Sequence, residues 1–291
     1  MEETFVDAEI ASQPETWLAA ARLARDSVDM LPAVGERVAF VGCGTSWFIS
    51  MSAAAHRESA GLGESDAFAA SEFPSNRRYD LVVAISRSGT TTEVVELLSR
   101  VTGRTLLITG VSDSPAAAAA DHTIELPFAD EQSVVQTRFA TSVLALLRAG
   151  SGEDLTTAID NARDALRIEI DPLLDIDQAT FVGTGWAIGL AYEAALKTRE
   201  AAQFWAESYP AMDYRHGPIS IAQPGRLVWN LGGSPEGLAD EVAAAGATYV
   251  DHDLDPLARL IVAQRLAVAL AKRRGLDPDR PRSLTRSVIL T

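Results

Sequence analysis

A turn rich in hydroxyl side chains follows an apolar run that ends near residue 85. Residues 86–91 read Ser-Arg-Ser-Gly-Thr-Thr and open a stretch with a helical pattern. Free backbone N–H groups at the start of a helix attract anions, and hydroxyl groups can add further donors. Gly89 allows the backbone to approach an anion closely. The turn fits a phosphate site, although the same residue types are also the preferred N-caps of ordinary helices.

A second turn of this kind, Gly42-Cys43-Gly44-Thr45-Ser46, also ends an apolar run and opens a helical stretch. The carboxyl ends of parallel strands meet at one edge of a sheet, where open α/β sheets bind ligands. Two such turns therefore favour a phosphate site over two simple caps. Gly-x-Gly could also indicate a dinucleotide fold, but the third glycine and the acidic residue of that motif are missing. We interpret Cys43 as a packed residue rather than a nucleophile, because no histidine stands in a recognisable relation to it.

Three charged residues in the second half of the chain share one helical face. Glu193, Lys197 and Glu200 are spaced i, i+4 and i+7. A solvated face held by salt bridges is the simpler interpretation of such a pattern. The neighbouring residues are small or apolar, which indicates a helix packed on several sides, where charges are costly unless they act together. The neighbours in question are Ala194, Ala195, Leu196, Ala201 and Ala202. The face is a candidate for acid–base chemistry.

His216 follows this helix in the segment Asp213-Tyr214-Arg215-His216-Gly217-Pro218, a loop held by glycine and proline. Histidine is the side chain best suited to proton transfer near neutral pH. We predict a catalytic role for His216 and interpret His56, His122 and His252 as surface or capping residues.

The two halves of the chain resemble each other, which indicates a duplication. Residues 38–47 and 179–186 share an apolar run, Gly-x-Gly and a helical stretch. Two further matches follow in the same order, residues 71–74 with 207–210 and residues 81–85 with 227–231. We predict a duplicated α/β unit.

Short apolar runs alternate with helical stretches, which predicts a mostly parallel sheet flanked by helices on both faces. The predicted strands of the first half are 38–41, 81–85, 106–109 and 122–126, and the predicted helices of the chain are 11–31, 91–101, 137–148, 153–168 and 256–274. The expected division is an N-terminal helical segment at 1–34, a first domain at 35–150, a linker helix at 151–174 and a second domain at 175–291 that includes an extended tail from 281.

Composition excludes several classes of protein. The 291 residues carry a net charge of −15, and the acidic residues are spread along the chain, so nucleic acid is not an expected partner. A single cysteine excludes an intrachain disulfide and a multi-cysteine zinc site. The N-terminus shows neither the basic nor the apolar part of a signal peptide, and no apolar run reaches the ~18 residues of a membrane span. We expect a cytoplasmic protein with no metal and no cofactor.

In combination, the motifs resemble the SIS (sugar isomerase) family. The resemblance is to the double-SIS group with the isomerase half of glucosamine-6-phosphate synthase and bacterial sugar-phosphate deaminases and deglycases. It covers almost the whole chain. The motifs that carry it are Cys-Gly-Thr-Ser at 43–46, Ser-x-Ser-Gly-x-Thr at 86–91, Glu-x-Ala-Leu-Lys-x-x-Glu at 193–200, His-Gly-Pro at 216–218 and Pro-Arg-x-Leu at 281–284.

The resemblance implies two flavodoxin-like lobes and a role for each matching residue. Glu200 would move a proton between C1 and C2 of the sugar, with Lys197 to orient it. His216 would open the sugar ring and would come from the neighbouring subunit of a homodimer. The residues implied to bind the phosphate are Ser46, Ser86, Arg87, Ser88 and Thr91, and those implied to face the sugar are Thr45, Val134 and Glu193.

Departures from the synthase pattern shape the expected activity. No glutaminase domain and no N-terminal cysteine precede the SIS-like part, so we do not expect the synthase reaction. Arg286 stands where the synthase carries a Schiff-base lysine; an arginine stays protonated but can polarise a sugar oxygen. The leading hypothesis is aldose–ketose isomerisation coupled to C–N cleavage of an amino-sugar phosphate or a fructosamine phosphate. A plain sugar-phosphate isomerase and a non-catalytic sugar-phosphate sensor are the alternatives.

Overall fold

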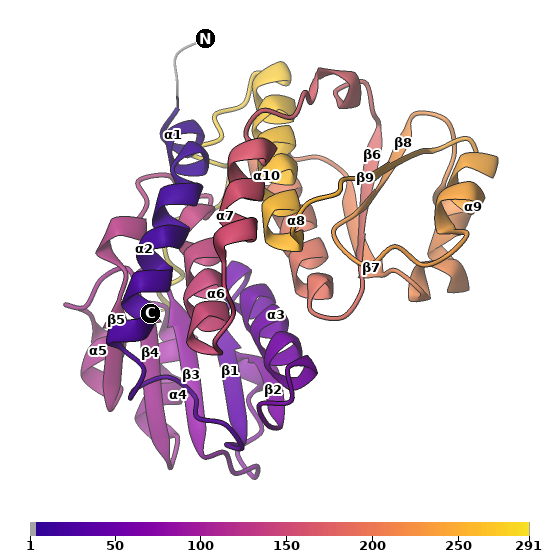
Figure 1. Cartoon of the computed structure of the whole chain (residues 1–291). Coiled ribbons are helices and arrows are strands. Elements are labelled where there is room, and N and C mark those ends of the chain that lie inside the picture. Colours follow the sequence, from indigo (N-terminus) through magenta and orange to yellow (C-terminus); the bar gives the residue numbers. More distant parts are fainter. Residues whose placement is uncertain (1–3, 291) are drawn as a thin grey trace. The chain divides into compact units, whose positions relative to one another are not determined.

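The computed structural model describes residues 4–290 of the chain (Figure 1). They form two compact units. We call the unit made of 12–132, 136–155 and the tail from Thr285 the first lobe. The second lobe is the unit made of the described residues up to Ala11, the segment Ser133–Val135 and Thr156–Leu284. The four-part division expected from the sequence stays a prediction.

The first lobe is built on a five-stranded parallel sheet in the order β2-β1-β3-β4-β5. Its strands are β1 (Val38–Gly42), β2 (Ser65–Ala69), β3 (Leu81–Ser86), β4 (Arg104–Thr109) and β5 (His122–Glu125). Its helices are α2 (Gln13–Asp26), α3 (Thr45–Ser59), α4 (Thr92–Arg100), α5 (Pro115–Ala119) and α6 (Arg138–Gly150), with short 3-10 turns η1 (Ala70–Glu72) and η2 (Pro127–Ala129).

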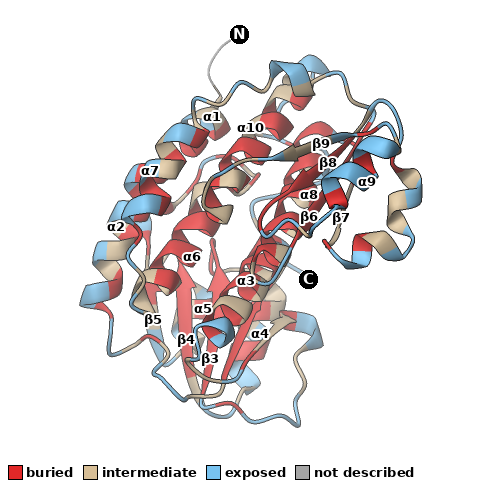
Figure 2. Ribbon diagram, turned by 45° about the vertical axis from the view of Figure 1, so that its right-hand side comes forward, coloured by how far each residue is buried: buried red, intermediate tan, exposed pale blue. Residues whose placement is uncertain are grey.

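Helices cover both faces of this sheet, with α4 and α5 on one side and α3 and α6 on the other (Figure 1). Every residue of β1 and β3 is buried, as expected of strands that are covered on both faces. Figure 2 shows β3 and β4 buried along their length, while the outer face of α2 is exposed. The predicted α/β fold of the first half is confirmed.

The second lobe repeats this plan with a four-stranded parallel sheet in the order β7-β6-β8-β9. Its strands are β6 (Gln178–Gly183), β7 (Ala206–Pro210), β8 (Arg226–Asn230) and β9 (Thr248–Asp251). Its helices are α1 (Phe5–Ala11), α7 (Thr156–Ala165), α8 (Ala187–Ala202), α9 (Leu238–Ala244) and α10 (Pro256–Arg273), with 3-10 turns η3 (Asp171–Leu173), η4 (Asp213–His216) and η5 (Pro218–Ile221).

Strand register tests the predicted duplication. Val38 lies opposite Leu81 in the first sheet, and Ala179 lies opposite Leu227 in the second, so the match of 81–85 with 227–231 is confirmed. The match of 71–74 with 207–210 is wrong. Gly42 pairs with Ala69 and Gly183 with Pro210, so the equivalent of Pro210 is the last residue of β2. Residues 71–74 lie beyond that strand, in η1 and the loop after it.

The helix predicted at 11–31 is found as α2 and ends at Asp26, earlier than predicted, while α1 precedes the predicted range and was missed. Helix α2 begins after Ser12 with Pro14 in its first turn, where a missing N–H costs nothing. The C-terminal helix is confirmed as α10, and the Asp255 side chain caps it by accepting a hydrogen bond from the Leu257 N–H at 2.9 Å. Within residues 4–290, every helix is too short or too polar to cross a membrane.

Candidate active site

The two hydroxyl-rich turns meet in the first lobe, as the sequence predicts. The β1–α3 turn and the β3–α4 turn line one small cavity of about 30 Å³. Both turns need glycine, since Gly44 and Gly89 have φ angles of 54° and 65°. We call this cavity the phosphate cradle. Its lining residues are Cys43, Ser46, Ile85, Ser86, Arg87, Ser88, Thr91, Val94, Gln136 and Arg286.

The serines of the β3–α4 turn hold the backbone of that turn in place. Ser86 Oγ accepts a hydrogen bond from the Gly89 N–H at 3.2 Å, and Ser88 Oγ accepts one from the Thr90 N–H at the same distance. Only 4% of Ser86 and 8% of Ser88 is exposed. Because both oxygens act as acceptors here, their hydroxyl protons point elsewhere and can be donated to an anion. The turn is therefore held by its own side chains, and the two hydroxyl protons remain available for donation.

Arg87 lines the cradle, but its guanidinium also bonds within the lobe. Its Nη1 lies 3.4 Å from Glu131 Oε2, and its Nη2 donates to the Arg286 carbonyl at 3.2 Å. Glu131 accepts hydrogen bonds from the N–H groups of Thr137 and Arg138 at 2.5 and 2.8 Å, and so caps the start of α6. Arg87 is 2% exposed and Glu131 is 2% exposed. The pair ties the β3–α4 turn to α6.

The C-terminal tail lies against the same turn. The Thr92 N–H, at the start of α4, donates to the Val288 carbonyl at 3.2 Å. Ser287 Oγ and Thr90 Oγ1 are 2.9 Å apart. The Arg286 guanidinium, which is predicted to act on the sugar, forms an ion pair with Asp130 and donates to the Glu131 carbonyl. Arg286 is thereby brought to the cradle wall.

The charged face of the second lobe is buried rather than solvated. Glu193 and Lys197 are 0% and 1% exposed. Lys197 Nζ lies 2.5 Å from Glu200 Oε2 and 3.5 Å from Glu193 Oε1. A buried ammonium is tolerated only with such partners, so the two carboxylates together keep the lysine in place. Glu200 is the most accessible of the three, with 19% of its side chain exposed.

This geometry excludes the simpler interpretation of a solvated salt-bridged helix. The small residues that flank the triad, Ala194, Ala195, Ala201 and Ala202, are buried as predicted. Glu193, expected to face the sugar, is fully buried beside Lys197. The arrangement can present one carboxylate, that of Glu200, with a fixed cation behind it.

His216, Thr45 and Val134 occupy different settings. His216 ends η4, is exposed, and its ring forms no hydrogen bond with a described residue. Gly217, which follows, has a φ angle of 141°. Thr45 is 4% exposed at the start of α3, next to Ser46. Val134 belongs to the second lobe, where its N–H donates to the Asp279 carbonyl at 3.0 Å.

The sequence did not predict a role for Gln136, a polar residue of the cradle, or for Glu131, which pairs with Arg87. Glu131 and Gln136 lie in the segment between β5 and α6, far along the chain from both hydroxyl-rich turns. The Gln136 Oε1 atom is buried and forms no hydrogen bond within residues 4–290. Only Thr137, a residue of a preferred capping type just before α6, gave a local signal for this segment.

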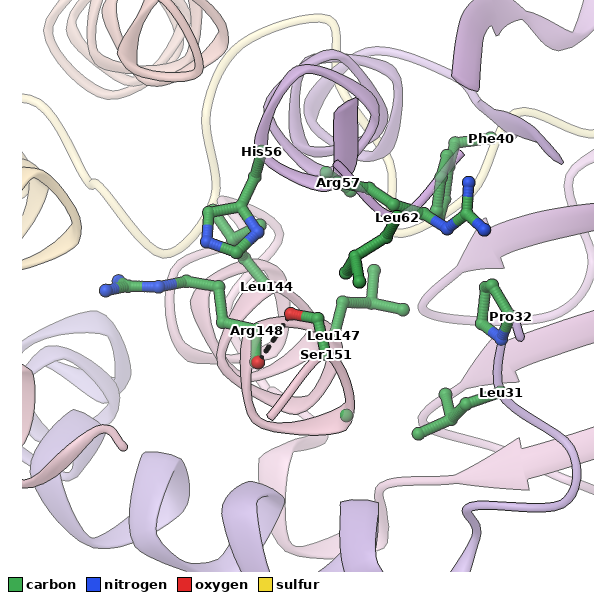
Figure 3. A pocket seen from close by; sticks show the side chains of 12 residues that line it. Leu31, Pro32, Phe40, His56, Arg57, Leu62, Leu144, Leu147, Arg148 and Ser151 are labelled. Atoms are coloured by element: carbon green, nitrogen blue, oxygen red, sulfur yellow. Dashed lines mark hydrogen bonds between the residues drawn. The ribbon is translucent and has the colours of Figure 1, made fainter. Parts of the chain in front are cut away.

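His56 was interpreted as a surface or capping residue, and this is wrong. Its Nε2 lies 2.9 Å from Glu153 Oε2, and Arg148 Nη2 lies 2.5 Å from Glu153 Oε1. Burial alone would raise the pKa of Glu153, but hydrogen bonds from Arg148 and His56 outweigh it and lower that pKa to about 2. Figure 3 shows His56, Arg148, Leu144 and Leu147 on the wall of another small cavity of the first lobe. The volume of that cavity is about 30 Å³.

Cys43 is a poor nucleophile in this setting. Burial, assisted by the negative charge of Glu93, raises the pKa of its thiol to about 11. The thiol is therefore protonated near neutral pH, as the interpretation of a packed residue requires. Among residues 4–290, no three His, Cys, Asp or Glu side chains gather in a way that could hold a metal ion.

The first lobe matches a known family. Residues 33–149 match the SIS domain family. The chain carries a SIS domain. The hydroxyl-rich turns 42–46 and 86–91 both lie inside the SIS domain.

Comparison with full-length proteins extends the similarity beyond the SIS domain. The chain is 30% identical over 265 residues to a glutamine–fructose-6-phosphate aminotransferase (isomerizing) of Aeropyrum pernix, which covers 72% of this chain and 43% of that protein. A homologue of the same name from Sulfurisphaera tokodaii is 27% identical and covers 87% of this chain and 50% of that protein. The chain spans about half the length of these relatives.

Solved structures match nearly the whole chain. The structure of a glucosamine-6-phosphate deaminase from Thermotoga maritima superposes with a TM-score of 0.83 at 26% identity, covering 99% of this chain and 100% of that one. The C-terminal domain of a glucosamine-fructose-6-phosphate aminotransferase from Francisella tularensis gives a TM-score of 0.78 at 22% identity, covering 96% and 99%. The predicted fold of two flavodoxin-like lobes is confirmed.

Proposed function

We propose that the chain is a phosphosugar isomerase of the deaminating type, which converts a 2-amino-2-deoxy-aldose phosphate and water to a ketose phosphate and ammonia. The observation that carries the proposal is the buried Lys197 held between Glu193 and Glu200, of which Glu200 alone is notably accessible. A sensor would not need a carboxylate oriented in this way. The deaminase from Thermotoga maritima, similar over the whole length of both chains, supports C–N cleavage.

The phosphate cradle supplies binding. Ser86, Ser88 and Thr91 place hydroxyl groups where α4 begins, and the positive end of the helix dipole adds to them. Ser46 contributes from the start of α3. Arg87 and Arg286 each have a carboxylate partner, so the cradle binds an anion mainly through hydroxyl and backbone donors. This suits a phosphate monoester in a chain with a net charge of −15.

The chemistry assigned to the second lobe is a proton transfer between neighbouring carbons. His216 opens the sugar ring. The Glu200 carboxylate then removes the proton from C2 of the open aldehyde, and an enolamine forms as the C1 oxygen takes up a proton from water, which the nitrogen gives back when the imine forms. Return of the proton at C1 leaves an imine at C2. Water adds to C2, and ammonia leaves to give the ketose phosphate. Lys197 fixes the orientation of Glu200 through the contact at 2.5 Å.

His216 is exposed in its own chain, which agrees with a role at the site of a neighbouring subunit in a homodimer. Mixing two inactive variants tests this. A Glu200→Gln chain and a His216→Asn chain, unfolded and refolded together, would form mixed dimers with one intact site, and about a quarter of wild-type activity would return. Recovery of no activity in verified mixed dimers would place His216 within its own chain.

A substrate panel tests the function. The purified protein is incubated with glucosamine, galactosamine and fructosamine 6-phosphates, and both ammonia or amine and the sugar product are measured. Ammonia together with a ketose phosphate is the expected outcome with one of the first two sugars. Amine release from the fructosamine would make the chain a deglycase. Isomerised sugar without release would indicate a plain isomerase, and binding without turnover would indicate a sensor. We expect the reaction in the cytoplasm.

A further inference from the structure

A second cavity of the first lobe lies away from the phosphate cradle. It has a volume of about 290 Å³, close to the lower end of the range for small-molecule sites. The loop between η1 and β3 forms one side, and the end of α4 forms the other. Its lining residues are Phe73, Ser75, Arg77, Tyr79, Val82, Leu97, Arg100, Val101 and Thr102.

Aromatic rings form one wall of this cavity. The ring centroids of Phe73 and Tyr79 are 5.8 Å apart, and Phe68 packs against both at 5.6 and 6.2 Å. Val82 and Leu97 are 2% and 1% exposed and close the floor. Such a wall offers flat apolar surface to a ligand with a ring or another planar body.

The rim of the cavity is positively charged in an otherwise acidic chain. The lining contains two arginines and no carboxylate. Arg77 is partly neutralised by Asp66, whose Oδ2 lies 3.6 Å from Arg77 Nη1. Arg100 is exposed in the last turn of α4 and forms no ion pair within residues 4–290. The rim therefore carries net positive charge and favours an anion.

Hydroxyl groups complete the rim. Ser75 and Thr102 are exposed, and neither side chain forms a hydrogen bond within the described part of the chain. They leave donors and acceptors beside the two guanidinium groups. Planar guanidinium groups bind carboxylates, sulfonates and phosphates through paired N–H donors.

We propose that this cavity is a second binding site, for a small anion with a flat apolar body. It is distinct from the phosphate cradle because it lies at the opposite ends of the same two elements. Val82 is near the start of β3 and Ser86 is at its end, while α4 begins at Thr92 by the cradle and ends at Arg100 by the cavity. Nine helical residues span ~13 Å.

Equilibrium dialysis with two probes of one shape tests the site. Naphthalene-2-sulfonate supplies a flat body with a negative charge, and naphthalene-2-methanol supplies a similar body without one. The sulfonate is expected to bind saturably, one per chain, and roughly tenfold more tightly than the alcohol because of the charged contact. Saturating glucose 6-phosphate is expected to leave the sulfonate in place.

Variants locate the bound probe. Arg100→Gln should remove most of the preference for the sulfonate, whereas Arg22→Gln, at an exposed arginine of α2, should leave it unchanged. Thr102→Trp should obstruct the mouth and weaken both probes. Circular dichroism and thermal melting confirm that each variant is folded. Displacement by glucose 6-phosphate, equal binding in Arg100→Gln, or no saturable binding below millimolar concentration would each overturn the proposal.

Discussion

The two lobes build the same turn from glycine and then use it differently. Gly44 and Gly185 follow β1 and β6 with φ angles of 54° and 57°. A Cβ atom on Gly42 would lie 2.6 Å from Ser46, and one on Gly183 would lie 2.4 Å from the Ala187 carbonyl oxygen. In both lobes the first turn of the following helix packs directly on the glycine, so the backbone leaves no room for a side chain.

The side chains at equivalent positions differ. Ser46 of the first lobe corresponds to Ala187, and the strand register places Gly232 at the position of Ser86. The second lobe has therefore lost two hydroxyl groups of the phosphate cradle. Its helix α8 carries Glu193, Lys197 and Glu200 where α3, counted in the same register, carries Ser52, His56 and Ser59. At these equivalent positions the first lobe therefore carries mainly hydroxyl groups and the second lobe carries the three charged groups.

The largest effect is expected at Glu200. Glu200→Gln keeps the shape of the side chain but removes the base, so kcat should fall by roughly 10³-fold, a typical contribution of general base catalysis. KM for the amino-sugar phosphate should change little, because the cradle is in the other lobe. Steady-state kinetics measure both. Unchanged kcat would show that the second lobe does not supply the base.

The matched control for this variant is Asp164→Asn. Asp164 is an exposed carboxylate of α7, and within residues 4–290 its one ion pair is with the exposed Arg167. The control should have wild-type kcat and KM, which separates the loss of a base from a general loss of negative charge.

A smaller effect, confined to binding, is expected in the cradle. Ser88→Ala removes one hydroxyl donor to the phosphate and should raise KM by roughly tenfold, since a hydrogen bond to a charged group contributes about 1.5 kcal/mol. Ser234 occupies the equivalent position of the second lobe, where its hydroxyl bonds Tyr249 at 2.6 Å. Ser234→Ala should leave KM unchanged. Equal effects of both changes would mean that the two turns bind substrate alike.

The sequence predicted the parts of this comparison that depend on local pattern. The central strands were found because they are apolar along their length, and the Glu193, Lys197 and Glu200 face was found because its spacing is helical. The strands β2, β7 and β9 were missed. They are edge strands, half-buried and mixed in polarity, so no continuous apolar run marks them.

What depends on tertiary contacts could not be predicted. Glu131 and Arg87 interact although 44 residues separate them in the chain. The sequence around either residue does not indicate the other as its partner. The predicted equivalence of Pro74 and Pro210 is wrong because it rested on similar residue types and did not take into account that β2 ends at Ala69. The sequence placed His56 in a helical stretch, but it did not indicate the partner Glu153, which lies beyond the end of α6.

His56 in α3 occupies the position that corresponds to Lys197 in α8. A change at Glu153, the partner of His56, tests what this position contributes in the first lobe. Glu153→Gln should lower the free energy of unfolding by about 1–2 kcal/mol at pH 7, a value discounted because a third of the side chain is exposed. The pKa of Glu153 is lowered to about 2, so its contribution is present above the ordinary carboxylate range. The contribution is lost as the pH falls toward 2, and the two proteins should converge there.

Urea unfolding at several pH values measures this difference. His56→Gln should reproduce part of the loss at pH 7, because it removes one of the two groups that bond Glu153. A difference between wild type and Glu153→Gln that is constant from pH 7 to pH 3 would contradict the assigned charge interaction.

The smallest effect is expected at Cys43, whose equivalent in the second lobe is Thr184. Cys43→Thr brings the residue of the second turn into the first and should change kcat/KM by less than about twofold, since a protonated, packed thiol acts through its volume. With a thiol pKa of about 11, the activity between pH 6 and pH 9 should have the same pH profile in both proteins. Alkylation of the wild-type thiol at pH 8 should likewise be slow. A loss of kcat of more than 100-fold in the variant, or rapid alkylation that abolishes turnover, would show that the first turn takes part in catalysis. The proposed division, with binding in the first lobe and catalysis in the second, would then be wrong.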